Sequence, residues 1–214
     1  MKLILDISAN TTKNDDKYAK RMIDNIKKID HKKYDIIFKA QLFESAALNI
    51  AMDKLHFDYI YNYCKKLGYQ CTASVFDILS LNFLMSYDVP FIKIANNKNL
   101  YYLIDYIPRK YNVLVSIDTP IYIEGYKGIE TLFCVSKYPA IIQDYKDFKH
   151  FSRHYNINGI SDHTTDLTFF NTSLESIIYY EHKYFEMHYA LPDSTGLDVD
   201  ANICKTPNML KEIL

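Results

Sequence analysis

The sequence contains little glycine, only five residues in 214, and no glycine-rich loop follows its first apolar segment. Dinucleotide-binding folds need such a loop, because glycine lets the backbone approach the phosphates closely. Its absence counts against a dinucleotide-binding fold. Tryptophan is absent altogether, and we attach no functional meaning to this.

An excess of charge of one sign is also lacking, since 25 basic and 26 acidic residues give a net charge of −1. This balance gives no reason to expect nucleic acid or an anionic membrane as a partner. No apolar stretch approaches the roughly 20 residues that a membrane span needs, and Asp6 comes too early for the apolar region of a signal peptide. We therefore expect a soluble, cytoplasmic protein that binds neither nucleic acid nor membrane.

Paired cysteines are missing as well. None of Cys64, Cys71, Cys134 and Cys204 forms a C-x-x-C pair, and Cys71 and Cys134 fall within apolar segments. Buried free thiols in a reducing compartment are the expected state.

A short apolar segment, a polar stop and a stretch with helical periodicity recur along the whole chain. Alternating strands and helices predict parallel strands joined by right-handed crossovers, and eight such units favour a closed (β/α)8 barrel. With 49% hydrophobic residues, the chain can bury one core, so we expect a single barrel domain over residues 1–214. A doubly wound sheet remains the alternative. The predicted strands are Leu3–Asp6, Tyr34–Phe38, Tyr69–Ser74, Phe91–Ile94, Asn112–Ser116, Thr131–Val135, Ile157–Ser161 and Tyr184–His188.

Helical periodicity predicts the helices between these strands. They include Asp15–Lys28, a helix ending at Leu67 before Gly68, Val75–Met85, Leu100–Ile107, Ala140–His150 and Leu167–Tyr180.

Polar residues close almost every predicted strand, and each has an ordinary explanation when taken alone. In a barrel, however, all eight carboxyl ends meet at one mouth. The residues that close the strands, in chain order, are Asp6, Lys39, Gln41, Ser74, Phe76, Lys93, Asn96, Ser116, Ser136, Tyr138, Ser161, His163, Glu186 and His188.

The chemistry of this set can be read from its functional groups. Two ammonium groups among hydroxyl and amide donors suit a phosphate or a phosphorylated carboxylate. The imidazoles of His163 and His188, on neighbouring strands, suit a divalent transition metal with open positions. Such a metal beside an anion site indicates Lewis-acid polarisation of a carbonyl.

Several segments resemble the sialic acid (nonulosonic acid) synthase family. Asn158-Gly159-Ile160-Ser161-Asp162-His163-Thr164 contains the family motif G-[IL]-S-D-H-T, the most specific of the matches. The others resemble, in the right order along the chain, E-I-G-x-N (Leu5–Asn10), K-x-Q (Phe38–Gln41), K-I-[AG]-S (Lys93–Ala95), E-[KR]-H (Glu186–His188) and G-P-D (Gly196–Asp198).

This resemblance implies an enzyme that condenses phosphoenolpyruvate with an N-acylated hexosamine such as N-acetylmannosamine. A divalent metal, Mn²⁺ or Mg²⁺, would bind the open-chain sugar aldehyde, water would attack phosphoenolpyruvate, and phosphate would leave by C–O cleavage. The resemblance makes His163 and His188 the metal ligands and Asp6 the counterpart of a family glutamate. It assigns phosphoenolpyruvate to Lys39, Ser74, Lys93, Ser116, Ser136 and Ser161, and the sugar to Gln41, Tyr138 and Asp198.

The sequence departs from the family pattern in three places. Asp6 is one methylene shorter than the family's glutamate. Asn96, Asn97 and Lys98 replace the family's S-G-E, so an acidic group near the metal is expected to be lost, and Ser136 stands where the family usually has asparagine. The chain also ends at Leu214, without the antifreeze-like domain expected after the barrel. Family members are dimers, and a homodimer is the candidate assembly.

Two other functions remain open. A related aldolase could condense phosphoenolpyruvate with another aldehyde, such as a phosphorylated sugar, and would then need further basic residues such as Arg109 or Arg153. A barrel that binds ligands without catalysis is the second alternative, prompted by the replaced glutamate.

Overall fold

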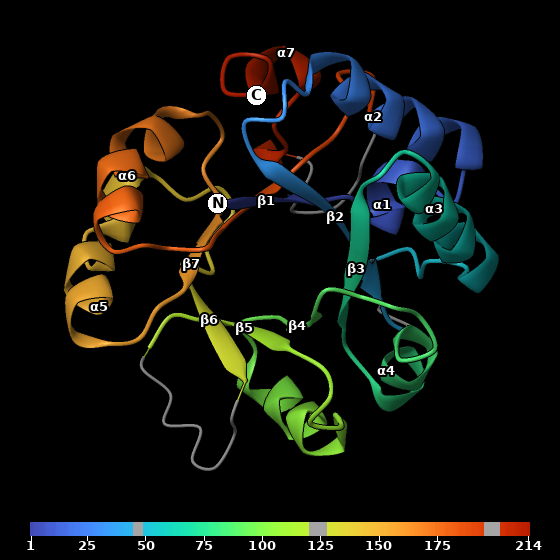
Figure 1. Ribbon diagram of the computed structural model, residues 1–214, viewed down its shortest axis with the longest axis horizontal. Coiled ribbons are helices and arrows are strands. Elements are labelled where there is room, and N and C mark those ends of the chain that lie inside the picture. The colour runs from blue at the N-terminus through green and yellow to red at the C-terminus, as the bar shows by residue number, and fades with distance from the viewer. Residues whose placement is uncertain (45–48, 120–127, 195–201) are drawn as a thin grey trace.

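The computed structural model describes residues 1–44, 49–119, 128–194 and 202–214. Eight parallel strands form a closed barrel in chain order, and β1 pairs with β8 to complete the ring (Figure 1). This confirms the predicted (β/α)8 fold and excludes the doubly wound sheet. The strands are β1 (Lys2–Asp6), β2 (Asp35–Leu42), β3 (Gln70–Val75), β4 (Ile92–Ile94), β5 (Val113–Ile117), β6 (Ile129–Cys134), β7 (Gly159–Asp162) and β8 (Tyr184–His188).

The helices surround this ring, as Figure 1 shows. They are α1 (Ala9–Thr12), α2 (Asp16–Ile29), α3 (Lys54–Lys66), α4 (Ile78–Leu84), the 3₁₀ helices η1 (Lys98–Tyr106) and η2 (Ile142–Tyr145), α5 (Phe148–His154), α6 (Thr168–Tyr179) and α7 (Pro207–Leu210).

Helix α2 illustrates how the local sequence builds these elements. The Asp15 carboxylate accepts the Lys17 amide at 2.9 Å and caps the first turn. Ala19, Met22, Ile23 and Ile26, spaced for one helical face, are all buried against the barrel.

The predicted helix at Ala140–His150 is wrong. The chain forms the short η2 there, and α5 begins only at Phe148 and continues to His154. Asp144 explains the difference, because its carboxylate accepts the Ile141 amide and pairs with Lys137, both at 2.9 Å. Such a local side-chain bond stabilises a tight turn in competition with a continuous helix.

The segment after β3 also differs from its prediction, since β3 continues through Val75 and α4 starts only at Ile78. Asp77 sets this boundary by accepting the Ser80 amide at 2.7 Å as the N-cap of α4. The expected helix at Leu100–Ile107 is present as η1, which Asn97 caps.

Side chains alternate between two cores along each strand. One set packs between the sheet and the helices, and the other fills the barrel interior towards the N-terminal ends of the strands with Ile4, Ile37, Phe91, Leu114, Leu132 and Tyr184. Two residues further along, the same inward face carries polar groups, for example Asp6 after Ile4 and Lys93 after Phe91. The barrel is therefore apolar at its N-terminal end and polar at its C-terminal end.

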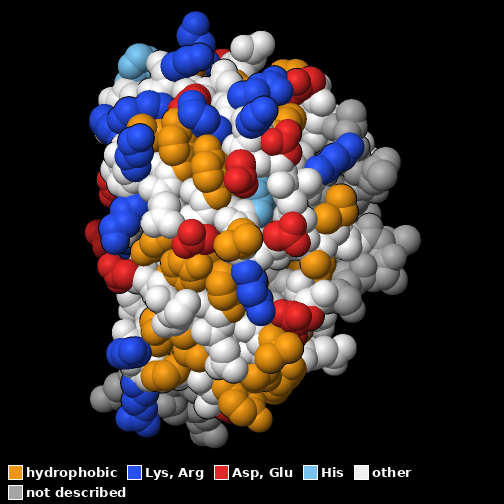
Figure 2. Space-filling model, turned by 90° about the vertical axis from the view of Figure 1, so that its right-hand side faces the viewer, with side chains coloured by type: hydrophobic (Ala, Val, Ile, Leu, Met, Phe, Trp, Pro, Cys, Tyr) orange, Lys and Arg blue, Asp and Glu red, His pale blue; other side chains and the backbone are white. Residues whose placement is uncertain are grey.

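The face of the molecule in Figure 2 carries charges of both signs. On the face in Figure 2, basic and acidic side chains lie among each other, with apolar groups between them. Among the described residues, no helix is both long enough and apolar enough to cross a membrane.

Candidate active site

A cavity of about 210 Å³ opens at the C-terminal ends of the strands, where barrel enzymes place their chemistry. A larger cavity of about 930 Å³ lies at the opposite end, around the starts of β1, β2, β6 and β8. Every predicted site residue except Asp198 lines the smaller cavity, and Asp198 falls outside the described residues. Its lining is Asp6, Lys39, Gln41, Asn49, Ser74, Phe76, Lys93, Ala95, Asn96, Ser116, Cys134, Ser136, Tyr138, Ser161, His163, Glu186 and His188.

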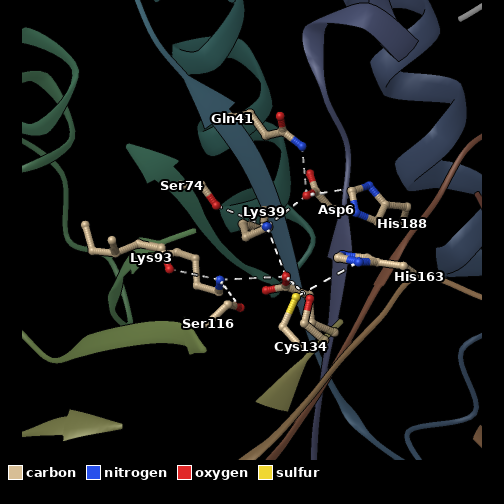
Figure 3. Close-up of polar contacts among 12 residues, drawn as sticks. Asp6, Lys39, Gln41, Ser74, Lys93, Ser116, Cys134, His163 and His188 are labelled. Carbon is tan, nitrogen blue, oxygen red and sulfur yellow. Dashed lines mark hydrogen bonds and ion pairs between the residues drawn. The ribbon is translucent and has the colours of Figure 1, made fainter. Parts of the chain in front are cut away.

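Lys39 lies at the centre of the polar network (Figure 3). Its ammonium group is 2.8 Å from Asp6 Oδ2 and 3.3 Å from Glu186 Oε1, and it donates to Ser74 Oγ at 3.1 Å. Burial alone would lower the pKa of Lys39, but the attraction of Asp6 and Glu186 outweighs burial and raises it. Lys39 is therefore a cation at neutral pH.

Lys93 enters the cavity from β4 and is only 1% exposed. Its ammonium group donates to Ser116 Oγ at 2.7 Å and to the Ile94 carbonyl at 3.2 Å, and lies 3.9 Å from Glu186 Oε1. Burial lowers the pKa of Lys93, and the nearby charge of Lys39 adds to this, against the attraction of Glu186. The pKa values of the two ammonium groups are thus shifted in opposite directions, that of Lys39 upwards and that of Lys93 downwards.

Glu186 joins the two lysines and also accepts a bond from Ser161 Oγ at 2.9 Å. Burial alone would raise its pKa, but Lys39 and Lys93 lower it to about 2. Its second oxygen, Oε2, and Asp6 Oδ1 are buried with no hydrogen-bond partner among the described residues. Buried oxygens of this kind usually have a partner, so a donor or cation brought by a ligand would complete them.

The two histidines lie side by side, with ring centroids 5.5 Å apart. His163 Nδ1 is 2.6 Å from the Val135 carbonyl, which makes Nδ1 the protonated nitrogen and leaves a lone pair on Nε2. Burial lowers the pKa of His163 to about 3, so its imidazole is neutral near pH 7. Tyr138 stacks on this ring at 4.3 Å between centroids, and its hydroxyl lies 3.3 Å from Nε2.

These groups fit a divalent metal in kind. A neutral imidazole whose other nitrogen bonds a carbonyl is the usual form of a histidine ligand. Asp6 Oδ2 lies 3.7 Å from His188 Nδ1, and Asp6 Oδ1 lacks a partner among the described residues. The described residues contain no cluster of three or more His, Cys, Asp or Glu side chains that could hold a metal. Two imidazoles would therefore have to share the metal with water and substrate.

Asn96 and Ser136 touch in the cavity, where Asn96 Nδ2 donates to Ser136 Oγ at 2.9 Å. The sequence has asparagine where the related family has serine, and serine where it has asparagine. Because the two positions are in contact, this cavity holds one amide and one hydroxyl, as the family pattern does, but each stands at the other's position.

Asn97 and Lys98, which stand in the positions of the family's glycine and glutamate, are exposed, and neither is among the described residues that line the cavity. Neither side chain therefore replaces the family's glutamate as an acidic group in the cavity. Among the described residues, the carboxylates that line the cavity are Asp6 and Glu186.

Sequence reasoning assigned no role to Glu186 and treated Cys134 only as a buried thiol. The sequence already placed Glu186 at the barrel mouth. Strand alternation could also have placed Cys134 there, since it lies two residues after Leu132, which faces the barrel interior. Burial raises the pKa of Cys134 to about 12, so its sulfur stays protonated. Arg109 and Arg153 are exposed and do not line the cavity.

Comparison with solved structures identifies several barrels of the same fold. The N-acetylneuraminic acid (sialic acid) synthetase of Leptospira borgpetersenii superimposes with a TM-score of 0.77 at 21% identity, over 98% of this chain and 80% of that one. The spore coat polysaccharide biosynthesis protein spsE of Bacillus subtilis gives 0.77 at 20% identity, over 98% of this chain and 65% of that one. A truncated 3-deoxy-D-arabino-heptulosonate 7-phosphate synthase of Thermotoga maritima gives 0.69 at 9% identity, over 99% and 83%.

These identities establish the common fold alone, and a comparison with curated protein sequences found no match. The family model of the NeuB family, in contrast, matches residues 9–214, which is nearly the whole chain. The match includes both lysines, both histidines and every strand except β1. The chain therefore belongs to the NeuB family.

Proposed function

We propose that this protein is a metal-dependent nonulosonic (sialic) acid synthase that condenses phosphoenolpyruvate with an N-acylated hexosamine such as N-acetylmannosamine. Membership of the NeuB family supports a phosphoenolpyruvate-condensing synthase of carbohydrate biosynthesis. The observation that carries the finer proposal is the pair of buried ammonium groups, Lys39 and Lys93, beside two neighbouring imidazoles in one cavity.

The lysine side of the cavity would bind phosphoenolpyruvate. Lys39 and Lys93 provide the charge, and the hydroxyls of Ser74, Ser116 and Ser161 surround them. Ionised phosphate and carboxylate groups give this substrate a charge of about −2.5 to −3 at neutral pH. The two lysines are already balanced by Asp6 and Glu186, so a divalent cation bound beside them would offset most of the incoming charge.

His163 and His188 would hold that cation, and imidazole ligands favour Mn²⁺ over Mg²⁺. When bound, the metal supplies Lewis-acid polarisation of the acceptor's aldehyde. Gln41 and Tyr138 lie beside this position, since Gln41 Nε2 donates to Asp6 Oδ2 at 3.0 Å and Tyr138 covers His163. These two side chains would orient the sugar.

The reaction would join C3 of phosphoenolpyruvate to the aldehyde carbon and add water at C2. Cleavage of the bond between C2 and the phosphate oxygen then leaves a 2-keto acid and inorganic phosphate. One water proton ends on the former aldehyde oxygen and the other on the leaving phosphate. Lys93, with its lowered pKa, is the cavity ammonium better able to donate a proton to that phosphate.

Phosphate release tests the proposal directly. Purified protein is incubated with phosphoenolpyruvate, Mn²⁺ and a panel of N-acyl hexosamines, and inorganic phosphate is measured with and without acceptor. We expect acceptor-dependent release that chelation of the metal stops and that His188→Ala abolishes, whereas the exposed-site variant Lys98→Ala retains it. Absence of turnover with every acceptor, or full activity of His188→Ala, would refute the proposal.

Adding phosphorylated aldehydes to the panel tests a related aldolase, a reaction class suggested by the likeness to the Thermotoga maritima fold. Such a substrate needs cations for its second phosphate. Arg109 and Arg153 are exposed and are not part of the cavity lining, which favours the unphosphorylated N-acyl sugar.

A further inference from the structure

Lys205 follows β8 in the chain, and its whole residue is buried, with 0% exposure. Its ammonium group lies 3.0 Å from Asp162 Oδ2, which is equally inaccessible. A buried ion pair loses about as much from desolvation as it gains from attraction, and a well-packed apolar pair is often as stable. Stability alone therefore does not account for this pair.

The pair holds the backbone on both sides of His163. Asp162 directly precedes this histidine, and its carboxylate accepts the Thr164 amide at 2.9 Å and the Thr164 hydroxyl at 3.1 Å. Lys205 also donates from its ammonium group to the Thr164 carbonyl. The contacts of Asp162 and Lys205 therefore hold the backbone of residues 162–164 on the side away from the cavity.

The main chain of the same residue holds His188. The Lys205 amide donates to the His188 carbonyl at 2.7 Å, and the Ala190 amide donates to the Lys205 carbonyl at 3.1 Å. Tyr189 and Lys205 form a parallel β-bridge through these bonds. One residue therefore contacts the backbone next to both histidines.

We propose that Lys205 is a positioning residue that sets the separation of His163 and His188, and so makes the segment after β8 part of the metal site. The inference rests on the proposed function in so far as the histidines bind a metal. Neither Lys205 nor Asp162 is among the described residues that line the cavity. Lys205 therefore acts through the strand ends, as groups behind metal ligands commonly do.

The test compares Lys205→Met, the double variant Lys205→Met/Asp162→Asn and a control, Leu81→Ala. Leu81 is fully buried on α4, next to β3, so its truncation destabilises the fold without touching Lys205. Mn²⁺ affinity is measured by electron paramagnetic resonance of free Mn²⁺, and stability by urea unfolding.

We expect Lys205→Met to be strongly destabilised, because the Asp162 charge is left buried alone. The double variant should regain much of this stability, yet its dissociation constant for Mn²⁺ should stay about 10- to 100-fold above that of the wild type. Leu81→Ala should lose stability and keep the wild-type affinity.

Amide hydrogen exchange without metal provides a second measurement. Peptides covering residues 161–164 and 188–190 should exchange faster than in the wild type in both Lys205 variants. In Leu81→Ala their exchange rates should equal those of the wild type. If the wild type binds no Mn²⁺, the metal part of the proposed function fails, while exchange still decides whether Lys205 holds both segments. Wild-type affinity and protection in the double variant, or an equal loss of affinity in Leu81→Ala, would overturn the inference.

Discussion

Among the described residues, Glu186 is the single carboxylate that contacts both cavity lysines, at 3.3 Å and 3.9 Å. It lies on β8 two residues before His188, so the proposed anion-binding and metal-binding halves of the site would share one strand. At the scale of the residue, the charge balance of the cavity therefore depends on whether this group is ionised.

Replacing Glu186 with glutamine tests this balance through the pH dependence of stability. The folded pKa of about 2 lies below the ordinary value of 4.5. Ionised Glu186 therefore stabilises the fold above about pH 4.5, and this contribution is lost as the pH falls towards 2. We expect Glu186→Gln to cost about 3–5 kcal/mol at pH 7 and much less at pH 3, measured by urea unfolding without added metal.

Histidine 163 also disfavours folding in acid, since its folded pKa is lowered to about 3. Burial lowers the pKa of His163 and the charge of Glu186 raises it, so Glu186→Gln lowers this pKa further. Because folded His163 is already neutral above about pH 4, its penalty there is the same in both proteins, and the difference between them reports Glu186. A difference that stays constant from pH 7 to pH 3 would contradict the assignment.

Lys93 offers a second residue-scale prediction. Lys93→Met keeps the length of the side chain and removes the ammonium group that would bind phosphoenolpyruvate. We expect kcat/KM for phosphoenolpyruvate to fall by about 30-fold or more, which corresponds to about 2 kcal/mol or more. The exposed Lys98→Met serves as the matched control, and equal kinetics of the two variants would remove Lys93 from the substrate site.

At the scale of the element, Gly159 permits the close approach of β7 and β8. A Cβ atom at this position would overlap the Tyr184 carbonyl oxygen and lie 2.8 Å from its carbon, both backbone atoms that cannot turn away. His163 directly follows β7, and His188 ends β8. The separation of the histidines thus depends on a residue that has no side chain.

Gly159→Ala should therefore force the two strands apart. We expect a loss of about 3 kcal/mol in the free energy of unfolding, at the upper end of the cost of overpacking. Gly68→Ala is the comparison, because its φ of +82° is strained for alanine while its surroundings are open. This strain should cost about 1 kcal/mol, and thermal unfolding that ranks Gly68→Ala as the worse variant would contradict the steric argument.

At the scale of the whole molecule, the apolar interior and the polar cavity lie at opposite ends of the barrel axis. Phe91 fills the N-terminal half of the interior against Tyr184, with ring centroids 5.7 Å apart. Lys93, two residues later on the same face, belongs to the cavity at the other end.

Truncating this apolar half should therefore affect stability and spare the site. We expect Phe91→Ala to lower the free energy of unfolding by about 3–5 kcal/mol, and the milder Phe91→Leu to lower it less. Binding of Mn²⁺ and phosphoenolpyruvate by the folded fraction, followed by calorimetry, should remain unchanged. A large loss of affinity in Phe91→Leu would show that the two halves are coupled.

The sequence by itself determined the barrel and most of its cavity. Strand-like segments followed by polar residues specify a parallel barrel, and barrel geometry sends residues as distant as Asp6 and His188 to one mouth, where they occupy paired positions on β1 and β8. Local periodicity suffices for this, because side-chain alternation and the direction of the strands follow from the backbone alone.

Only the tertiary structure decided which polar groups touch. The bridge of Glu186 between two lysines, the contact of Asn96 with Ser136 and the hold of Lys205 on two strand ends join residues far apart in the chain. No periodicity encodes these contacts, because they depend on how neighbouring strands are staggered and on where a segment beyond β8 returns. The burial that lowers the pKa of His163, and the two lysines that lower the pKa of Glu186 against its burial, likewise come together only once the barrel has closed.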